Sequence, residues 1–489
     1  MTLSPDTMQH RPSKKTNTKQ QSAKDYAKLG NQAYRAGNLL HALEYYAHSV
    51  SKEPDNQGYK LRLAHLLKDV HFTSFNPKFK TLILRCLQTD GIDHQSLATP
   101  WLSLFSCDNN YDILHKLMQG EDVKQDKKIL SCLKDPYFTQ GIACLSVYDV
   151  TFESMLHYLG HDLVERLTLP KAFKQAFDAY CERSEYIFCA GVPTDTRYPT
   201  DKTIPTLGIV SDTVSENVRS HYEQNPYPRW TSINIQTASR EDAAKNHKHL
   251  IAGCGTGNGA CATALKYPNA QITAIDLSLS SLTYAKSKAH ELGLDNISFL
   301  HGDILNLSDL KGTYDVIECS GVLHHMDDPA HGWRCLINKL ADNGKMHIGL
   351  YSELGRSDVI AVKTLIEEHK YEPTHAGITS ARNRIIALPD SHPAKAVLTR
   401  RDFYSTSSCR DLIFHQHEYR YTIQQLQKML DELNLVFGGF DLHTPATAKR
   451  YLAQYPDDPK MLNLKNWHLF EIENSDIFRG MYQFWCHVK

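Results

Sequence analysis

A short apolar run followed by alternating glycines constrains the fold of this chain more than any other feature. Residues 249–259 read His-Leu-Ile-Ala-Gly-Cys-Gly-Thr-Gly-Asn-Gly, and residues 260–265 carry small and apolar side chains that suit the start of a helix. The pattern predicts a strand, a tight turn and a helix. Because glycine has no Cβ atom and tolerates positive φ, such a turn lets the backbone approach a ligand closely. Many α/β proteins bind nucleotides in this way, so the segments that follow must decide which ligand the turn serves.

Three further segments follow the glycine turn in a regular order. Residues 271–276 form a β-prone run that ends in Asp276, residues 297–304 form another that ends in Gly-Asp-Ile, and residues 314–325 form a buried run that enters a loop. In a βαβ nucleotide fold, an acid at the tip of the second strand accepts hydrogen bonds from ribose hydroxyls. The spacing of the strands, with helical stretches between them, predicts a parallel, doubly wound α/β sheet.

A dinucleotide-binding fold is the competing interpretation of these segments. That fold favours the pattern G-x-G-x-x-G, which places its third glycine at position 258, but Asn258 stands there and Gly259 is its neighbour. The acidic tip at Asp303 and the loop after Ser320 have no function in NAD binding. The sequence therefore favours a different adenosine-containing ligand.

In order and spacing, the four segments resemble the class I S-adenosylmethionine-dependent methyltransferases over residues 246–352. The resemblance implies a Rossmann-like sheet of seven strands and S-adenosyl-L-methionine as cofactor. It implies that the glycine turn lies under the methionine part, that Asp276 holds the ribose, that Asp303 with Ile304 holds the adenine, and that Ser320 and Leu323 flank the methionine side. The cofactor-binding residues predicted in this way are Gly253, Cys254, Gly255, Thr256, Gly257, Asp276, Leu277, Asp303, Ile304, Ser320 and Leu323.

One position departs from the pattern of that family. The family often has an acid two residues before the first glycine, and this chain has Ile251 there. We therefore expect the ammonium group of the cofactor to be held by backbone carbonyls or by another acid.

The chain has 489 residues, more than one domain normally contains. The segments that we predict are a disordered tail (1–22), tetratricopeptide-like helices (23–70), a helical domain (71–192), a linker that contains Asn-Pro-Tyr-Pro-Arg-Trp (193–245), the cofactor-binding core (246–352), an inserted lid and acceptor region (353–420) and the C-terminal part of the methyltransferase fold (421–489).

Charge and cysteine content argue against several classes of protein. The 54 basic and 55 acidic residues give a net charge of −1, so no overall field attracts nucleic acid or an anionic membrane. No apolar run approaches the ~20 residues of a membrane span. The 12 cysteines include no C-x-x-C pair, which predicts free thiols and a cytoplasmic protein. Because adjacent residues such as His324 and His325 point in different directions, we also expect no metal site.

Residues 23–56 show the spacing of a single tetratricopeptide unit. Gly30, Ala42, Tyr46 and Pro54 stand at its offsets, which predicts two amphipathic helices with a turn at residues 37–38. A single unit cannot bury its own apolar face. The helices therefore either form a peptide-binding groove or pack as a cap on the same chain or on the second subunit of a homodimer.

The segment at 353–420 is an insertion after the fifth core strand, and it supplies our candidates for the acceptor site. An insertion at this point lies over the carboxyl edge of the sheet, where ligands bind. The candidates are Arg410, Asp411, His415, His417 and Glu418. The alternative is that the insertion is a structural lid. Tyr227, in the predicted linker, is a further candidate because its segment either covers the cofactor or packs the linker onto the sheet.

Most of the chain resembles a bacterial group of proteins that join tetratricopeptide repeats to a methyltransferase. The matching pieces include Ser184–Phe188, Asn225–Trp230, Ile251–Gly257 and Cys409–His415. The chain is similar to the rickettsial-type lysine methyltransferases that modify outer-membrane proteins. That similarity implies a lysine side chain of a protein as acceptor, and a dimer.

The sequence thus leads to three functional hypotheses. The first is a methyltransferase that acts on a protein amino group, with Asp411, His415 and Tyr227 as candidates for removing the acceptor's proton. The second is a methyltransferase that acts on a small molecule or natural product. The third is a scaffold protein that binds the cofactor without turnover. We find no basic stripe with interleaved aromatic residues, so nucleic acid is not expected as a partner.

Overall fold

The structure is a computed structural model that divides into two compact units, residues 1–192 with 231–234 and residues 193–230 with 235–489. It describes residues 2–3, 21–121, 126–184, 200–208, 213–224, 226, 230, 233, 239–415, 418–442 and 444–489. Tyr227, His417, residues 185–188 of the family resemblance and most of the predicted tail lie outside the described residues.

The first unit is built from helices. They are α1 (Ala23–Arg35), α2 (Leu39–Lys52), α3 (Gln57–Leu67), α4 (Pro77–Leu87), α5 (Ala98–Ser106), α6 (Asn109–Met118), α7 (Asp126–Leu133), α8 (Pro136–Cys144), α9 (Val150–His157) and α10 (Lys171–Ser184). A short parallel pair joins β1 (Thr2–Leu3) to β2 (His71–Phe72), so part of the predicted tail is paired. The core of the unit is aromatic, with Trp101 stacked on Phe105 and Tyr137.

Helices α1 and α2 pack through the residues that the repeat spacing singled out. Gly37 has a φ of +75° and Asn38 caps α2, so the turn lies where the sequence predicts it. A Cβ atom on Gly30 would come within 2.7 Å of the Tyr46 ring, and Ala42 and Tyr46 are buried. The absence of a side chain at Gly30 is therefore what allows the two helices to approach each other.

The second unit contains an eight-stranded sheet in the order β3-β6-β5-β4-β7-β8-β10-β9. Its strands are β3 (Thr206–Leu207), β4 (Lys248–Ala252), β5 (Gln271–Asp276), β6 (Ile297–Gly302), β7 (Tyr314–Ser320), β8 (Leu340–Leu350), β9 (Leu435–Phe440) and β10 (Tyr482–Val488). The pairs that β10 forms with β8 and with β9 are antiparallel, and the other pairs of the sheet are parallel. The doubly wound α/β prediction is confirmed, and the expectation of seven strands is one too few because β3 pairs with the edge of β6.

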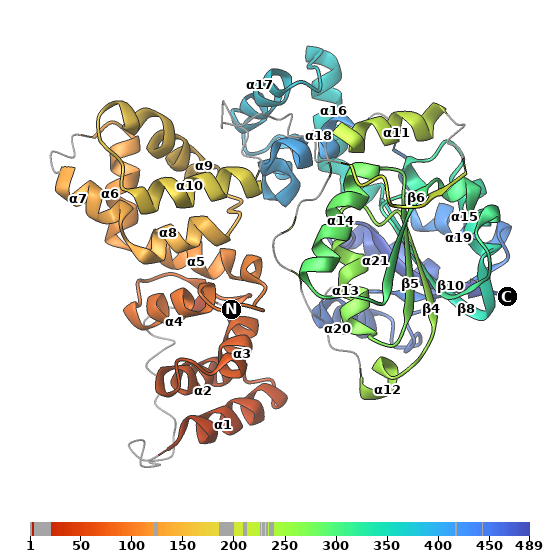
Figure 1. Cartoon of the computed structure of the whole chain (residues 1–489), viewed down its shortest axis with the longest axis horizontal. Coiled ribbons are helices and arrows are strands. Elements are labelled where there is room, and N and C mark those ends of the chain that lie inside the picture. Colours follow the sequence, from red (N-terminus) through yellow and green to blue (C-terminus); the bar gives the residue numbers. More distant parts are fainter. Residues whose placement is uncertain are drawn as a thin grey trace. The chain divides into compact units, whose positions relative to one another are not determined.

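Helices cover both faces of this sheet. Figure 1 shows α13 (Asn258–Lys266) and α14 (Leu279–Glu291) on one face, and α15 (Pro329–Ile337) and α19 (Ile423–Glu432) on the other. Thr422 and Gln425 form a capping box at the start of α19, and Leu426 and Leu430 are buried below it. This helix therefore begins at a residue that suits an N-cap and buries one apolar face.

Several elements of the second unit differ from the sequence prediction. The segment expected to be a linker contains β3, α11 (Thr213–Gln224) and α12 (Arg240–Ala243). Two helices, α20 (Pro445–Gln454) and α21 (Leu464–Glu473), stand between the closing strands, where the sequence analysis placed none. The insertion after β8 folds into α16 (Ser357–His369), α17 (His375–Ile386) and α18 (Thr406–Phe414), joined by 3-10 turns at Pro393–Thr399 and Arg401–Tyr404.

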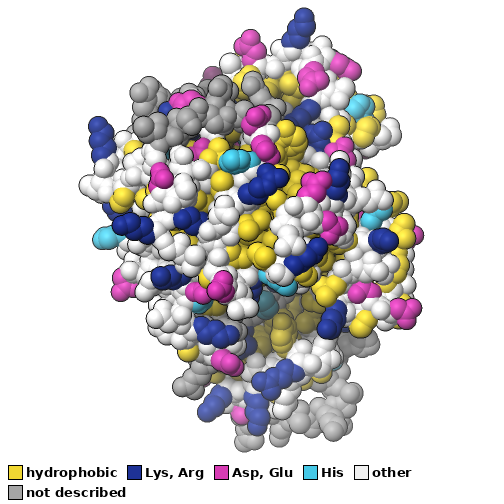
Figure 2. All heavy atoms as spheres, turned by 90° about the vertical axis from the view of Figure 1, so that its right-hand side faces the viewer, with side chains coloured by type: hydrophobic (Ala, Val, Ile, Leu, Met, Phe, Trp, Pro, Cys, Tyr) yellow, Lys and Arg dark blue, Asp and Glu magenta, His cyan; other side chains and the backbone are white. Residues whose placement is uncertain are grey.

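Charged side chains of both signs are mixed on the face that Figure 2 shows, without a continuous area of one sign. No helix within the described ranges has the length and apolarity needed to cross a bilayer.

Ten of the described cysteines are free thiols, whereas Cys181 is disulfide-bonded. The prediction of free thiols throughout is therefore wrong for Cys181.

Candidate functional site

A cavity of about 450 Å³ opens where the carboxyl ends of β4, β5, β6 and β7 meet α11 and the insertion. This is the edge at which doubly wound sheets bind ligands, beside the switch point between β4 and β7. The cavity is lined by Ser215, Val218, Tyr222, Gly253, Cys254, Gly255, Thr256, Asn258, Gly259, Asp276, Leu277, Ser281, Gly302, Asp303, Ile304, Ser320, Gly321, Val322, His325, Met326, Tyr351, Arg356, Arg400, Asp402, Asp411, Leu412, Gly480 and Met481.

The glycine turn forms one wall of the cavity, and at two of its glycines there is no room for a side chain. At Gly253 the φ angle is +78°, and a Cβ atom there would lie 2.1 Å from Cγ2 of Val322. At Gly257 the φ angle is +82°, and a Cβ atom would lie 2.5 Å from that of Ala285 on α14. Gly253 thus brings the turn against the loop after β7, whereas Gly257 allows α13 and α14 to pack and does not line the cavity.

Asp276 fastens the glycine turn to the tip of β5. Its carboxylate accepts hydrogen bonds from the N–H of Gly255 at 2.7 Å and from the N–H of Ser278 at 2.9 Å. The N–H groups of Gly253 and Cys254 both donate to the carbonyl of Ile275. Burial raises the pKa of Asp276 above the ordinary aspartate value, against the lowering effect of the two backbone hydrogen bonds.

The remaining strand ends complete the part of the cavity that the sequence predicted. Asp303 is buried at the end of β6 and accepts a hydrogen bond from the N–H of Leu305. Ser320 lies at the end of β7, with its hydroxyl 3.3 Å from the sulfur of Met481. Burial raises the pKa of Cys254 well above the ordinary thiol value, so this side chain is a neutral part of the wall. Leu323 packs in the core below the loop and does not line the cavity.

The fit of this wall to an adenosine cofactor can be judged from the residues themselves. The turn has no side chains where the backbone must approach a ligand, and a carboxylate stands at the tips of β5 and β6. An acid at the tip of the second strand of such a fold accepts hydrogen bonds from ribose hydroxyls. Ile251, at the position where an acid is often found, is buried in β4. Asp402 and Asp411 are acids from the insertion that line the same cavity.

Helix α11 forms a second wall that the sequence analysis interpreted as linker. Ser215, Val218 and Tyr222 line the cavity, and their spacing of three and four residues is that of one helix face. Glu223 holds the helix in place by accepting hydrogen bonds from the N–H groups of Leu279 and Ser280, at 2.6 and 3.1 Å, at the start of α14. This spacing was the signal that could have identified the wall.

Trp230 anchors the chain just before the first core strand. Its indole N–H donates to the carbonyl of Thr256 in the glycine turn at 2.9 Å, and its backbone exchanges hydrogen bonds with the hydroxyl of Tyr284 on α14. From the sequence, the segment is expected either to cover the cofactor or to pack the linker onto the sheet. Trp230 packs against the glycine turn and α14, which flank the sheet. The other aromatic candidate, Tyr227, lies outside the described residues.

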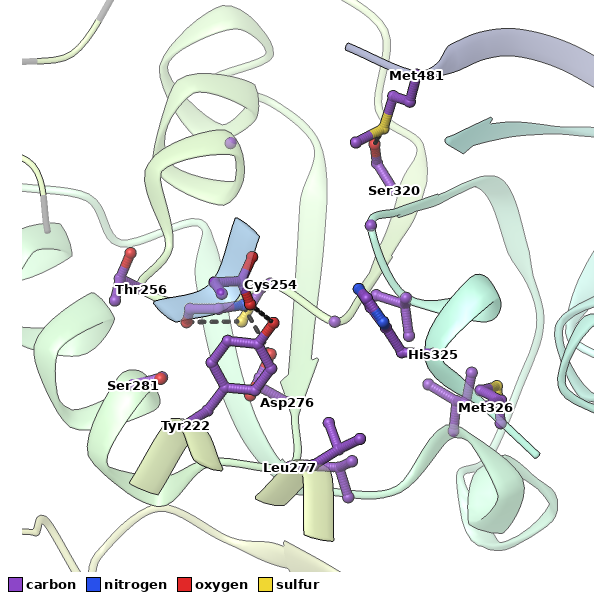
Figure 3. A pocket seen from close by; sticks show the side chains of 18 of the residues that line it. Tyr222, Cys254, Thr256, Asp276, Leu277, Ser281, Ser320, His325, Met326 and Met481 are labelled. Carbon is purple, nitrogen blue, oxygen red and sulfur yellow. Dashed lines mark hydrogen bonds between the residues drawn. The ribbon is translucent and has the colours of Figure 1, made fainter. Parts of the chain in front are cut away.

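The insertion contributes Asp411 but not His415 to the cavity surface. Asp411 accepts a hydrogen bond of 2.8 Å from the hydroxyl of Tyr222, which joins α18 to α11 across 189 positions of the chain. Figure 3 shows Tyr222 and His325 pointing into the cavity from different sides, with Asp276 and Leu277 below. His415 is buried behind His325, with ring centroids 3.9 Å apart.

Two other charged candidates of the insertion, Arg410 and Glu418, do not line the cavity. Glu418 accepts two hydrogen bonds from Arg356, both 2.9 Å, and one of 3.0 Å from Lys363. The guanidinium of Arg356 lies 3.8 Å above the Tyr351 ring. Glu418 is therefore committed to an internal ion pair and does not line the cavity. Among the residues that the structure describes, no group of three His, Cys, Asp or Glu side chains is placed to hold a metal ion.

Comparison with known proteins identifies the sheet and its cavity. Residues 250–346 match the family model described as methyltransferase domain. The sheet order, with its antiparallel β10, is that of the class I methyltransferase fold, and S-adenosylmethionine is the cofactor of this domain.

Similarity to some relatives extends beyond residues 250–346, but each alignment covers only part of the relative's length. An uncharacterized protein of Synechococcus is 28% identical over 48% of this chain and 62% of its own. A malonyl-[acyl-carrier protein] O-methyltransferase of Priestia megaterium is 23% identical over 37% of this chain and 58% of its own. Among solved structures, PKMT2 from Rickettsia typhi is 17% identical over 52% of this chain and 50% of its own, with a TM-score of 0.40. In each comparison the chain spans less than two thirds of the relative.

Proposed function

We propose that this protein is an S-adenosylmethionine-dependent methyltransferase whose acceptor is an amino group of a protein side chain, with lysine as the favoured residue. Bound at the glycine turn, the cofactor supplies an electrophilic methyl group. The chain's own residues must then bind the acceptor, orient it and remove a proton from it. We assign the ribose to Asp276, the adenine to Asp303 and Ile304, and the methionine part to the turn at Gly253–Gly257.

The observation that carries the choice of an amine is the charge of the wall contributed by the insertion. Arg356 and Arg400 reach the cavity, but each guanidinium is paired with a buried carboxylate, Glu418 for Arg356 and Asp358 for Arg400. Asp402 and Asp411 line the same wall, and the hydrogen bond that Asp411 accepts from Tyr222 comes from a neutral hydroxyl. The carboxylates of Asp402 and Asp411 on this wall support a cationic acceptor.

The helical unit supports a protein acceptor because helical repeats present extended surfaces to peptides. Homodimerisation through that unit is the other use that we propose for it. We propose a reducing compartment such as the cytoplasm, which the ten free thiols support and the disulfide at Cys181 does not.

A small-molecule acceptor is the second candidate. It is favoured by the relative from Priestia megaterium, whose name describes O-methylation of a malonyl group on a carrier protein. An O-methyl ester is hydrolysed by base, whereas a methylated amine is stable, so the two candidates differ in a property that can be measured.

The test uses purified protein, radiolabelled S-adenosylmethionine and a size-fractionated lysate of the source cells. We expect label in protein bands that resists mild base. Label that is lost in base, or that appears only in the small-molecule fraction, contradicts the amine proposal and favours the second candidate. Cofactor binding by calorimetry without any transfer favours the scaffold hypothesis. Asp411→Asn should abolish most of the labelling, and Asp390→Asn is the matched control because Asp390 is fully exposed in the same insertion.

A further inference from the structure

Three imidazole rings and a phenol ring meet at one side of the cavity. His324 and His325 belong to a 3-10 turn after β7 (Leu323–His325), His415 ends α18, and Tyr351 follows β8. Ring centroids lie 4.3 Å apart for His324 and His325, 3.9 Å for His325 and His415, and 3.8 Å for His324 and Tyr351. All three histidines are less than a tenth exposed. A polar cluster of this kind has a cost of burial that packing alone does not explain.

Only one of the three histidines reaches the cavity. His325 lines it, in the company of Tyr351 and Met326, and points into it in Figure 3. His415 lies on the opposite side of the His325 ring, at an interplanar angle of 32°. His324 is fully buried, and burial lowers its pKa to about 3, so its ring is neutral and structural.

The surroundings of His325 suit a neutral imidazole that can accept a proton. The charged and titratable groups in this cluster and on the elements packed against it include His324, Tyr351, Arg356, Lys363, Asp402, Asp411, His415, Glu418 and Tyr419. Arg356 and Glu418 pair with each other. Two imidazolium rings in contact repel each other, so protonation of one ring of the His325–His415 pair disfavours protonation of the other.

We propose that His325 accepts the proton that the methyl acceptor must lose, that His415 positions the His325 ring by stacking on it, and that the acceptor is therefore a nucleophile that still carries its proton when it binds. In the amine case the acceptor ammonium gives one N–H proton to a ring nitrogen of His325 and keeps the electron pair of that bond. The neutral amine is then the nucleophile, and the imidazolium returns its proton to water. A carboxylate acceptor is already ionised and needs no such base.

This inference rests on the proposed methyltransferase function, and its test separates the two. The probes are poly-L-lysine and poly-L-glutamate, each incubated with radiolabelled S-adenosylmethionine and the full chain, as wild type, His325→Gln and His331→Gln. His331 is exposed on α15 and outside the cavity, which makes it the matched control. Calorimetry measures cofactor binding by each variant and shows whether the site is intact.

We expect the wild type to label poly-L-lysine, and His325→Gln to lower the rate by at least about 100-fold near pH 7.5, the usual contribution of a general base. Cofactor affinity should change less than about twofold. The rate ratio should shrink toward pH 9.5, where part of the lysine (pKa about 10.4) is deprotonated in solution. The NMR signal of the His325 ring, recognised by its loss in the variant, should be that of a neutral imidazole near pH 7.5.

Equal rates for wild type and His325→Gln, or a ratio that does not change with pH, overturn the role of His325 and leave the proposed function intact. Labelling of poly-L-glutamate alone overturns the need for a base and the amine acceptor. No labelling of either polymer overturns the inference together with the amine proposal.

The positioning role of His415 has its own readout. His415→Phe keeps a ring against His325, so we expect a rate within about fivefold of wild type and an unchanged pH profile. His415→Ala removes the ring and should lower the rate at least about tenfold at the same cofactor affinity. If Phe and Ala are equally damaging, His415 does more than position its neighbour.

Discussion

The wall of the cavity formed by strand ends and the wall formed by α11 and the insertion obtain their shape by different means. At the strand ends, backbone N–H groups and the glycine turn are fixed by Asp276 and Ile275. On the other side, side chains that are far apart in the sequence meet, as Tyr222 and Asp411 do. The first wall suits a ligand that is the same in every reaction cycle, such as a cofactor. The second wall can be altered by single substitutions without disturbing the sheet.

The strongest way to test this difference is to place a side chain in the backbone wall. Gly253→Ala puts a Cβ atom 2.1 Å from Val322 on a residue with a φ of +78°. Strain and overpacking together amount to about 3 kcal/mol, so we expect cofactor affinity to fall by about 100-fold in calorimetry. Gly58→Ala is the control, because this glycine lies in helix α3 and the nearest atom to its new Cβ is 3.4 Å away. Unchanged affinity in Gly253→Ala would show that the turn can move.

The corresponding change in the side-chain wall should affect turnover and not binding. Asp411→Asn removes the charge that we assign to the acceptor site, and we expect turnover to fall by about 30-fold or more, while cofactor affinity stays within about twofold. Single-turnover transfer of label, with calorimetry on the same samples, measures both quantities. A fall in cofactor affinity as large as the fall in turnover would place Asp411 in the cofactor site.

A smaller effect is expected from the contact that joins α11 to the insertion. Tyr222→Phe removes one hydrogen bond to a carboxylate, a contact worth about 1.5–3 kcal/mol, while keeping the ring. We expect turnover to fall by about tenfold. If Tyr222→Phe and Asp411→Asn act through the same contact, the double variant should be no worse than Asp411→Asn alone.

The smallest effect concerns pH and the backbone wall. Because burial raises the pKa of Asp276, its carboxylate takes up a proton at a higher pH than an ordinary aspartate. The ionised form accepts the hydrogen bonds of Gly255 and Ser278 more strongly than the protonated form, so cofactor affinity should fall as the pH falls, by less than about tenfold per pH unit. Calorimetry in a pH series measures this, and in Asp276→Asn the dependence should disappear. An affinity that rises on acidification would contradict the assignment.

The two walls also differ in how much of them the sequence predicts. The turn and the acids Asp276 and Asp303 stand directly after apolar runs, so local pattern is sufficient to place them at strand ends. Local pattern does not place Tyr222 or His325 at the cavity. For Tyr222 the reason is that the position of α11 depends on its contacts with α14 and α18. From sequence, the adjacent residues His324 and His325 suggest only the question of a metal site. The insertion suggests His415, although His325 stands between His415 and the cavity. Strand β3 escaped prediction because two residues carry no periodicity.

Helix α11 also has a consequence for the exchange of spent cofactor. The helix lines the cavity and is fastened at adjacent residues, by Glu223 to the start of α14 and by Tyr222 to α18. For a cofactor that leaves past this helix, the contacts of Glu223 and Tyr222 must break first. The lifetime of these contacts then sets how long the demethylated cofactor stays bound. Weaker hydrogen bonds from Glu223 to α14 would shorten that residence time, so the helix that shapes the site would also set the rate of product release.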